Sequence, residues 1–316
     1  LIAVSCVSGC GKTSAAIEQP YDVYATAADF GLSSNGTAEA KSYFASDLCV
    51  SEDVAIGTDS TDSQVAEGAG TFNLETNTVV YAKNLYERLY PASTTKILTA
   101  YIALKYCDDL DAMVTVSENA VNQASDSSVC NLKAGDVIRL RDLLYGLMLR
   151  SGNDAAVAIA EYISGDVDSF AALMNQEAAA MGATRSHFVN PNGLPDENHY
   201  TCVYDMYLIF SNAIKNDTFV SIIGTTSYDV TYTDASGEAV THTWENTNQY
   251  LTGNATTPDG FQIVGGKTGT TGEAGYCLVL YSYNPSGQPI ISIVFKADGK
   301  SNLYLLMNEM LQGFAI

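Results

Sequence analysis

The chain contains the stretch Tyr90-Pro91-Ala92-Ser93-Thr94-Thr95-Lys96, which runs directly into a segment with a regular apolar pattern. The apolar positions in that segment are Ile97, Leu98, Tyr101, Ile102 and Leu104. Intervals of three and four place such side chains on one face of a helix. The pattern therefore predicts a helix that begins shortly after Pro91, with Ser93 at or near its N-terminus.

Ser93 and Lys96 are one helical turn apart, so a hydroxyl and an amine can face the same cleft. A lysine there can act as a base if burial or a neighbouring cation lowers its pKa. A serine three residues before a lysine arises by chance in many chains. The pair therefore requires support from other parts of the sequence.

Two further short motifs that contain a serine or a lysine follow later in the chain. Ser151-Gly152-Asn153 lies between two predicted helices, and Lys267-Thr268-Gly269 lies in a predicted strand. Three elements in this order and context carry far more weight than any one of them.

The remaining pattern predicts strands, then helices, then strands and a closing helix. A hairpin is expected over 65–83 with its turn near 75–77. Helices are expected over 140–149, 154–163, 167–181 and 301–312, and strands over 261–264, 276–283 and 290–295. This order indicates an α+β domain whose helices pack on an antiparallel sheet.

The composition is that of a globular and strongly acidic protein. Of 316 residues, 47% are apolar and 16% charged, and the formal net charge is −21. Such a charge repels nucleic acid phosphates and anionic lipid surfaces, which excludes a nucleic-acid-binding function. After residue 20, no apolar run approaches the roughly 18 residues that a membrane-spanning helix needs.

With all three motifs present, the sequence resembles the penicillin-binding, serine acyl-transfer superfamily. It is most similar to the low-molecular-mass serine-type D-Ala-D-Ala carboxypeptidases, through Tyr90–Lys96, through Phe188-Val189-Asn190-Pro191-Asn192-Gly193-Leu194-Pro195 with His199, and through Gly266–Gly269. The resemblance covers about residues 70 to 315. It implies a β-lactamase/transpeptidase-like α+β fold, in which an antiparallel sheet is flanked by helices and a helical subdomain, roughly 105–215, is inserted in a catalytic domain over 46–316.

The resemblance also implies roles for the motif residues. Ser93 would attack the carbonyl between two D-alanines of a peptidoglycan stem peptide, Lys96 would take its proton, and Ser151 would help relay a proton to the leaving amine. The implied substrate-binding residues are Asn153, Lys267, Thr268, Gly269 and Thr270. Backbone N–H groups of Ser93 and Thr270 would form the oxyanion hole, β-lactams would acylate Ser93, and no cofactor is expected.

Two alternatives share this fold. A β-lactamase would need a deacylating glutamate in an E-x-x-x-N arrangement, and the corresponding region carries Asn190-Pro191-Asn192-Gly193 instead. A catalytically silent, lipid-anchored wall-binding protein is disfavoured because the motif residues are intact. The three histidines, His187, His199 and His242, fit no Ser-His-Asp triad, and the polar loop around His199 lacks the spacing of a metal site.

The first residues suggest export. Val7-Ser8-Gly9-Cys10 resembles a bacterial lipobox, so we expect residues 1–10 to be part of a signal segment and Cys10 to be a candidate for lipidation. Residues 11–45 are rich in Ala, Ser, Thr and Gly and read as a flexible tether. The expected location is the bacterial cell envelope, with a lipid anchor at the outer face of the cytoplasmic membrane as the only membrane contact.

Cysteine usage gives no sign of a metal or redox motif. The chain has seven cysteines without a C-x-x-C pair. If Cys6 and Cys10 belong to the leader, five remain, and one or two disulfides stay open.

Overall fold

The structure, a computed structural model, describes residues 45 and 47–316. The predicted leader with its Cys10 and the predicted tether, apart from residue 45, lie outside this part of the chain. Residues 48–316 make up one unit, which contains all the helices and strands named below.

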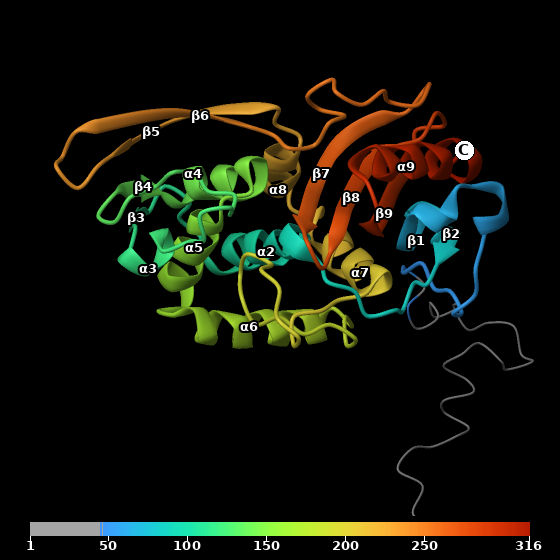
Figure 1. Ribbon diagram of the computed structural model, residues 1–316, viewed down its shortest axis with the longest axis horizontal. Coiled ribbons are helices and arrows are strands. Elements are labelled where there is room, and N and C mark those ends of the chain that lie inside the picture. Colours follow the sequence, from blue (N-terminus) through green and yellow to red (C-terminus); the bar gives the residue numbers. More distant parts are fainter. Residues whose placement is uncertain (1–44, 46) are drawn as a thin grey trace, which may run out of the picture. The chain divides into compact units, whose positions relative to one another are not determined.

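A five-stranded antiparallel sheet supplies one wall of the site, in the strand order β2-β1-β9-β8-β7 (Figure 1). Its strands are β1 (Ala66–Asn73), β2 (Thr78–Lys83), β7 (Gln262–Thr271), β8 (Gly275–Tyr283) and β9 (Pro289–Ala297). Strand β7 is an edge strand of this sheet, so one side of its backbone is not paired within the sheet.

The middle strands of this sheet are covered on both faces. In β8, Leu278 and Leu280 pack with the closing helix α9 (Lys300–Phe314), whereas Val279 and Tyr281 pack with the helical part of the chain. Alternate side chains of a strand point to opposite faces, so a run of apolar residues is what such a position requires. Figure 1 shows α9 on one side of the sheet and α7 on the other.

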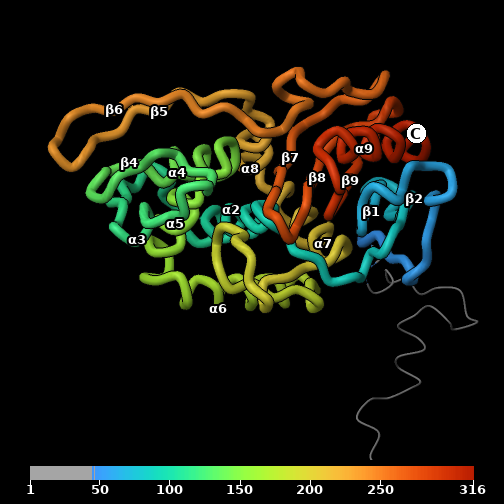
Figure 2. The backbone as a smooth tube through the Cα atoms, viewed as in Figure 1, coloured from blue at the N-terminus to red at the C-terminus, as the bar shows by residue number. Residues whose placement is uncertain are grey.

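The helical part is arranged around α2 (Lys96–Tyr106), as the tube in Figure 2 shows. Ile97, Leu98, Ala100, Ile102 and Ala103 of α2 are all fully buried. The other helices of this part are α3 (Glu118–Val121), α4 (Leu140–Tyr145), α5 (Asn153–Ser164), α6 (Val167–Ala180), α7 (Val203–Ala213) and α8 (Asp217–Ile223), of which α5 to α8 pack directly on α2. A helix with its apolar residues buried on most sides can hold side chains at its first turn in a fixed place, and Lys96 is the first residue of α2.

A second, smaller sheet has the order β3-β4-β5-β6 and was not predicted from the sequence. It consists of β3 (Met113–Thr115), β4 (Val137–Arg139), β5 (Ser227–Thr233) and β6 (Ala239–Glu245). The long β5–β6 hairpin lies beside α4 (Figure 1), and the rings of Tyr145 and Tyr228 stack at 3.8 Å between centroids. The alternation of Tyr228, Val230 and Tyr232 was the available signal for β5.

The structure confirms the other predicted elements. The hairpin is β1–β2, the three C-terminal strands are β7, β8 and β9, and the closing helix is α9. The helix expected over 140–149 is α4 followed by a π-helical turn, Gly146–Arg150. The five cysteines in the described part are all free thiols, so none of them forms a disulfide.

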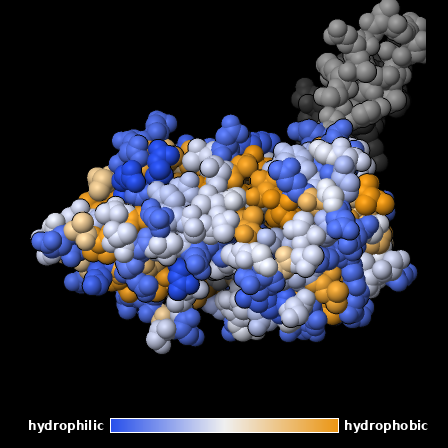
Figure 3. Space-filling model, turned by 90° about the horizontal axis from the view of Figure 1, so that it is seen from above, coloured by the Kyte–Doolittle hydropathy of each residue, from blue (hydrophilic) through white to orange (hydrophobic). Residues whose placement is uncertain are grey.

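Figure 3 shows one face of the molecule coloured by residue hydropathy. On this face hydrophilic residues predominate, and apolar residues lie among them. None of the helices in residues 45 and 47–316 is long and apolar enough to cross a membrane.

Candidate active site

Ser93 lies in a 3-10 turn, Ala92–Thr95, that leads directly into α2. Ala92 takes a left-handed conformation, with φ 47°, which is uncommon for a residue with a side chain. This turn presents Ser93 at the start of the helix, half-buried, whereas its neighbours Thr94 and Thr95 are fully buried.

The amine of Lys96 is fully buried and has three oxygen partners. Its Nζ lies 2.9 Å from Ser93 Oγ, 2.8 Å from Asn153 Oδ1 and 2.7 Å from the carbonyl oxygen of Asn192. Burial lowers the pKa of Lys96 well below its usual range, and the nearby charge of Lys267 lowers it further. The predicted pairing of a serine with a lysine of depressed pKa is therefore present in the structure.

Ser151 and Asn153 enter the site from the junction between the π-helical turn and α5. Ser151 ends the turn in a left-handed conformation, with φ 62°, and Asn153 is the first residue of α5. Both are buried, but only Asn153 is hydrogen-bonded to Lys96. Among the described residues, the Ser151 hydroxyl has no hydrogen-bond partner, so the structure places it near the site without linking it to Ser93 or Lys96.

Strand β7 brings the third motif against the turn that carries Ser93. A Cβ on Gly269 would lie 3.0 Å from the carbonyl oxygen of Pro91 and 3.1 Å from the backbone nitrogen of Ser93, so only a glycine allows this approach without displacement. Thr270, the next residue, lines the cleft beside Ser93. The strand position rather than a side chain thus determines where Thr270 N–H lies.

Lys267 is the second buried cation of the site. Its Nζ donates to the carbonyl oxygen of Thr268 at 2.9 Å, and burial lowers its pKa to about 7. The Thr268 hydroxyl lies 2.6 Å from the hydroxyl of Thr247. A lysine with such a pKa can gain or lose a proton at neutral pH.

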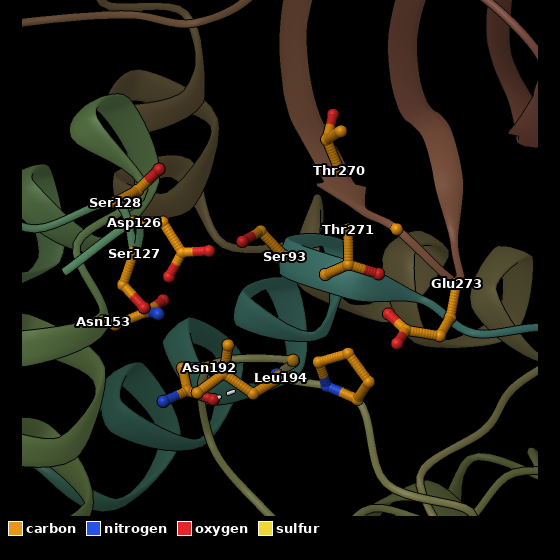
Figure 4. Close-up of a pocket in the computed structure, with 13 residues that line it drawn as sticks. Ser93, Asp126, Ser127, Ser128, Asn153, Asn192, Leu194, Thr270, Thr271 and Glu273 are labelled. Atoms are coloured by element: carbon orange, nitrogen blue, oxygen red, sulfur yellow. Dashed lines mark hydrogen bonds between the residues drawn. The ribbon is translucent and has the colours of Figure 1, made fainter. Parts of the chain in front are cut away.

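These elements enclose a cleft of about 360 Å³ (Figure 4). Ser93 lies between a wall that carries Asn153 and a wall that carries Thr270. The cleft residues not singled out as site residues from the sequence are Asp126, Ser127, Ser128, Asn192, Gly193, Leu194, Pro195, Thr271, Gly272 and Glu273. Figure 4 shows the carboxylates of Asp126 and Glu273 entering from opposite sides.

Asn192 could not be assigned a role from its side chain, because its backbone carbonyl makes the contact with Lys96. The only signal was the glycine that follows it. Gly193 has φ 87°, and a Cβ there would lie 1.9 Å from the carbonyl oxygen of Ala92. The loop therefore runs in direct contact with the turn before Ser93.

A buried histidine holds this loop against the turn that leads into α2. His199 Nε2 lies 2.9 Å from the Thr95 hydroxyl, and His199 Nδ1 accepts a hydrogen bond from Val189 N–H at 3.1 Å. Burial lowers the pKa of His199 to about 4, so the ring is neutral near pH 7. Within residues 45 and 47–316, no group of three or more His, Cys, Asp or Glu residues is placed to hold a metal ion.

Comparisons with known proteins identify the family of this chain. The family model described as D-alanyl-D-alanine carboxypeptidase matches residues 57–299. The chain belongs to this family. The family prediction made from the three motifs is confirmed.

Individual members of the D-alanyl-D-alanine carboxypeptidase family show how far the likeness extends. A D-alanyl-D-alanine carboxypeptidase of Streptomyces sp. (strain K15) is 34% identical over 79% of this chain and 88% of its own length. The carboxypeptidase DacF of Bacillus subtilis (strain 168) is also 34% identical, over 78% of this chain but only 61% of its own length. This chain thus spans about three fifths of the Bacillus relative.

Solved structures of this family confirm the predicted fold. The crystal structure of the Streptomyces K15 DD-transpeptidase covers 80% of this chain and 98% of its own, with a TM-score of 0.73 and 33% sequence identity. The carboxypeptidase DacD of Francisella tularensis covers 89% of this chain with a TM-score of 0.69 and 27% identity. The β-lactamase/transpeptidase-like α+β fold implied by the motifs is therefore correct.

Proposed function

We propose that this chain is a serine D-Ala-D-Ala carboxypeptidase, which removes the terminal D-alanine of a peptide through an acyl-enzyme on Ser93. The observation that supports it most directly is the fully buried amine of Lys96 at 2.9 Å from the Ser93 hydroxyl oxygen. A serine is a weak nucleophile until an adjacent base takes its proton. Lys96 is such a base.

The partners of Lys96 favour this direction of proton transfer. A neutral amine has two N–H donors and one lone pair. Asn153 Oδ1 and the Asn192 carbonyl oxygen can only accept, so they take the two N–H donors. The lone pair is then left for the hydroxyl proton of Ser93, which moves to Lys96 as Ser93 Oγ bonds to the substrate carbonyl carbon.

The rest of the cycle uses the other motif residues. The backbone N–H groups of Ser93 and Thr270 stabilise the negative charge on the tetrahedral carbonyl oxygen, at about 3 kcal/mol for each donor in comparable sites. Ser151 and Lys267 relay the proton to the leaving amine, the C–N bond breaks, and D-alanine departs. Water then attacks the ester on Ser93 and regenerates the hydroxyl.

Substrate binding is assigned to the β7 wall. Lys267 and Thr268 bind the terminal carboxylate, since a cation beside a threonine hydroxyl suits an anionic group in an otherwise acidic protein. Gly269 and Thr270 contact the substrate through their backbone groups, and Asn153 binds the substrate backbone through its side-chain amide. Because β7 is an edge strand, an extended peptide can add to it as a further strand.

The substrate class is the peptidoglycan stem peptide that ends in D-Ala-D-Ala, and β-lactams are the expected covalent inhibitors. This substrate places the enzyme outside the cytoplasmic membrane, in the bacterial cell envelope. A lipid on Cys10, which lies outside the described residues, would hold it there.

The test uses a fluorescent penicillin and a diacetyl-Lys-D-Ala-D-Ala peptide. Wild type, S93A and S301A are followed by intact mass and by release of D-alanine; Ser301 is an exposed serine on α9 that serves as the matched control. Stable label and D-alanine release in wild type and S301A, with neither in S93A, support the proposal. Rapid loss of label without peptide turnover would instead indicate a β-lactamase, and no label at all would indicate a silent binding protein.

A further inference from the structure

The carboxylate of Asp154 is buried beside the site, and its contacts run to a neighbouring loop. It accepts hydrogen bonds from Cys130 N–H, at 2.9 and 3.0 Å to its two oxygens, and from Leu132 N–H at 3.1 Å. One oxygen also accepts from Ala155 N–H, at 2.9 Å. Hydrogen bonds to an ionised acceptor are about twice as strong as neutral ones, so this carboxylate is a firm attachment point.

The loop that it attaches, residues 126–132, is here named the cleft-wall loop. Its first residues, Asp126, Ser127 and Ser128, line the cleft opposite Thr270 (Figure 4). The Ser128 carbonyl oxygen accepts a hydrogen bond from Asn153 N–H at 2.8 Å. The cleft-wall loop and the motif that carries Asn153 are thus joined at both Asp154 and Asn153.

The packing leaves little freedom at this junction. A Cβ on Gly152 would lie 2.3 Å from Cys130 Sγ and 2.8 Å from Asp154 Oδ1. Cys130 is fully buried and fills the space beneath Gly152. A displacement of Cys130 would therefore be passed directly to the segment between Ser151 and Asn153.

We propose that Asp154 is a positioning residue for the acylation step: it fixes the cleft-wall loop and Asn153 to each other, and so holds Asn153 Oδ1 against the amine of Lys96. The proposal rests on the function proposed above, in which Lys96 is the base. Asp154 itself has no hydrogen bond to Ser93 or Lys96 among the described residues.

The charge of Asp154 gives this role a signature that simple scaffolding lacks. Its negative charge raises the pKa of Lys96, against the larger lowering effects of burial and of Lys267. The other titratable groups near Lys96 are Cys130, whose pKa burial raises well above its usual value, and His199, so both are neutral near pH 7. Removal of the Asp154 charge must then lower the pKa of Lys96. Because Lys96 has to be neutral to act as the base, the acylation rate rises as pH increases through this pKa, and this rising part of the pH–rate profile, the acid limb, must move to lower pH.

The experiment compares three variants by the rate of acylation with a fluorescent penicillin across pH. D154N keeps the shape but turns an amide N–H₂ group toward N–H donors; D154E keeps the charge but alters the geometry. D205N is the matched control, because Asp205 is a buried carboxylate that accepts hydrogen bonds from Arg185 N–H at 2.8 Å and from the Ser186 hydroxyl at 2.7 Å. In the part of the chain that the structure describes, it has no hydrogen bond to a residue that lines the cleft.

We expect D154N to acylate about 100-fold more slowly, the size of effect caused by a misplacement of about 1 Å at a reacting group. Its acid limb should lie at lower pH than that of wild type. D154E should also be slow but keep the wild-type limb, and D205N should lower the melting temperature without changing the rate or the limb. Peptide turnover by each variant should fall in parallel with its acylation.

The proposal would be overturned by a folded D154N protein whose acylation rate and whose acid limb in the pH–rate profile both equal those of wild type. If D154N fails to fold, D154E decides: a folded D154E that acylates as fast as wild type overturns it, and a slow one supports it. Failure of the proposed function is recognised separately, because then wild type itself takes no label at Ser93.

Discussion

The carbonyl oxygen of Asn192 accepts a hydrogen bond from Lys96 Nζ at 2.7 Å, so a loop almost a hundred residues away in sequence completes the environment of the base. The link is made by backbone, and it depends on the loop being held against α2. Thr99 contributes through its hydroxyl, which donates to the Pro191 carbonyl oxygen at 2.7 Å. His199 contributes through Thr95.

The substitution K96A should abolish the activation of Ser93. Loss of a general base lowers rates by about 10² to 10⁴-fold, and K96A should therefore take up β-lactam at least about 100-fold more slowly than wild type. The measurement is intact mass after timed exposure to the penicillin. The control is K133A, because Lys133 directly follows the cleft-wall loop and does not line the cleft. Equal labelling of K96A and wild type would show that another group takes the proton.

The pH dependence of stability should report His199. Burial lowers the pKa of the His199 ring from an ordinary 6.5 to about 4. The folded protein therefore binds a proton at this ring less readily than the unfolded chain does. The resulting stability is fully present above pH 6.5 and is lost as pH falls toward 4, by up to about 3 kcal/mol. Urea unfolding of wild type and H199Q between pH 4 and 7 measures it. The slope with pH should be smaller in H199Q, and identical slopes would contradict a buried neutral histidine.

The elements that sequence predicted best were those with a strong local pattern. The apolar periodicity after Pro91 located α2, and the runs of β-prone residues in β8 and β9 located the central strands. Their burial on both faces follows from the same runs. The β5–β6 hairpin was not predicted, although Tyr228, Val230 and Tyr232 alternate with polar residues in β5. Its position depends on packing against α4, for example through the stacked rings of Tyr145 and Tyr228, and a local sequence pattern does not contain that contact.

The residues of the site also fall into those that the sequence predicted and those that it did not. The side chains to which the proposed mechanism gives roles, Ser93, Lys96 and Lys267, stand in short motifs and could be named in advance. Asn192 could not, because its contact with Lys96 is made by its backbone carbonyl oxygen. Asp154 and the cleft-wall loop could not, because their partners are N–H groups that no residue type reveals. The role of the Ser151 hydroxyl in proton transfer remains a prediction, since the structure shows no hydrogen bond between this hydroxyl and Lys96.

The charge of Lys267 should control recognition of the substrate carboxylate. Its pKa of about 7 means that the amine loses its charge as pH rises through neutrality. The KM for a peptide with a free C-terminal carboxylate should therefore increase above about pH 7, whereas a C-terminally amidated peptide should show no such change. In K267A the two peptides should become equally poor substrates. A wild-type enzyme that turns over both peptides equally well would remove this role from Lys267.

The contact of Gly193 with the turn before Ser93 can be tested against a second glycine of nearly the same backbone geometry. Gly193 and Gly237 have φ of 87° and 90°, but a Cβ would meet the Ala92 carbonyl oxygen at 1.9 Å in the first and nothing within 4 Å in the second. G237A should therefore cost only the backbone strain of a left-handed residue, about 1 to 2 kcal/mol. G193A must in addition push the loop away from Ala92, and with it the Asn192 carbonyl oxygen that accepts from Lys96. We expect G193A to lose more unfolding free energy than G237A and to acylate more slowly at a pH where both are folded. Equal stability and equal acylation of the two variants would show that the loop does not position the base.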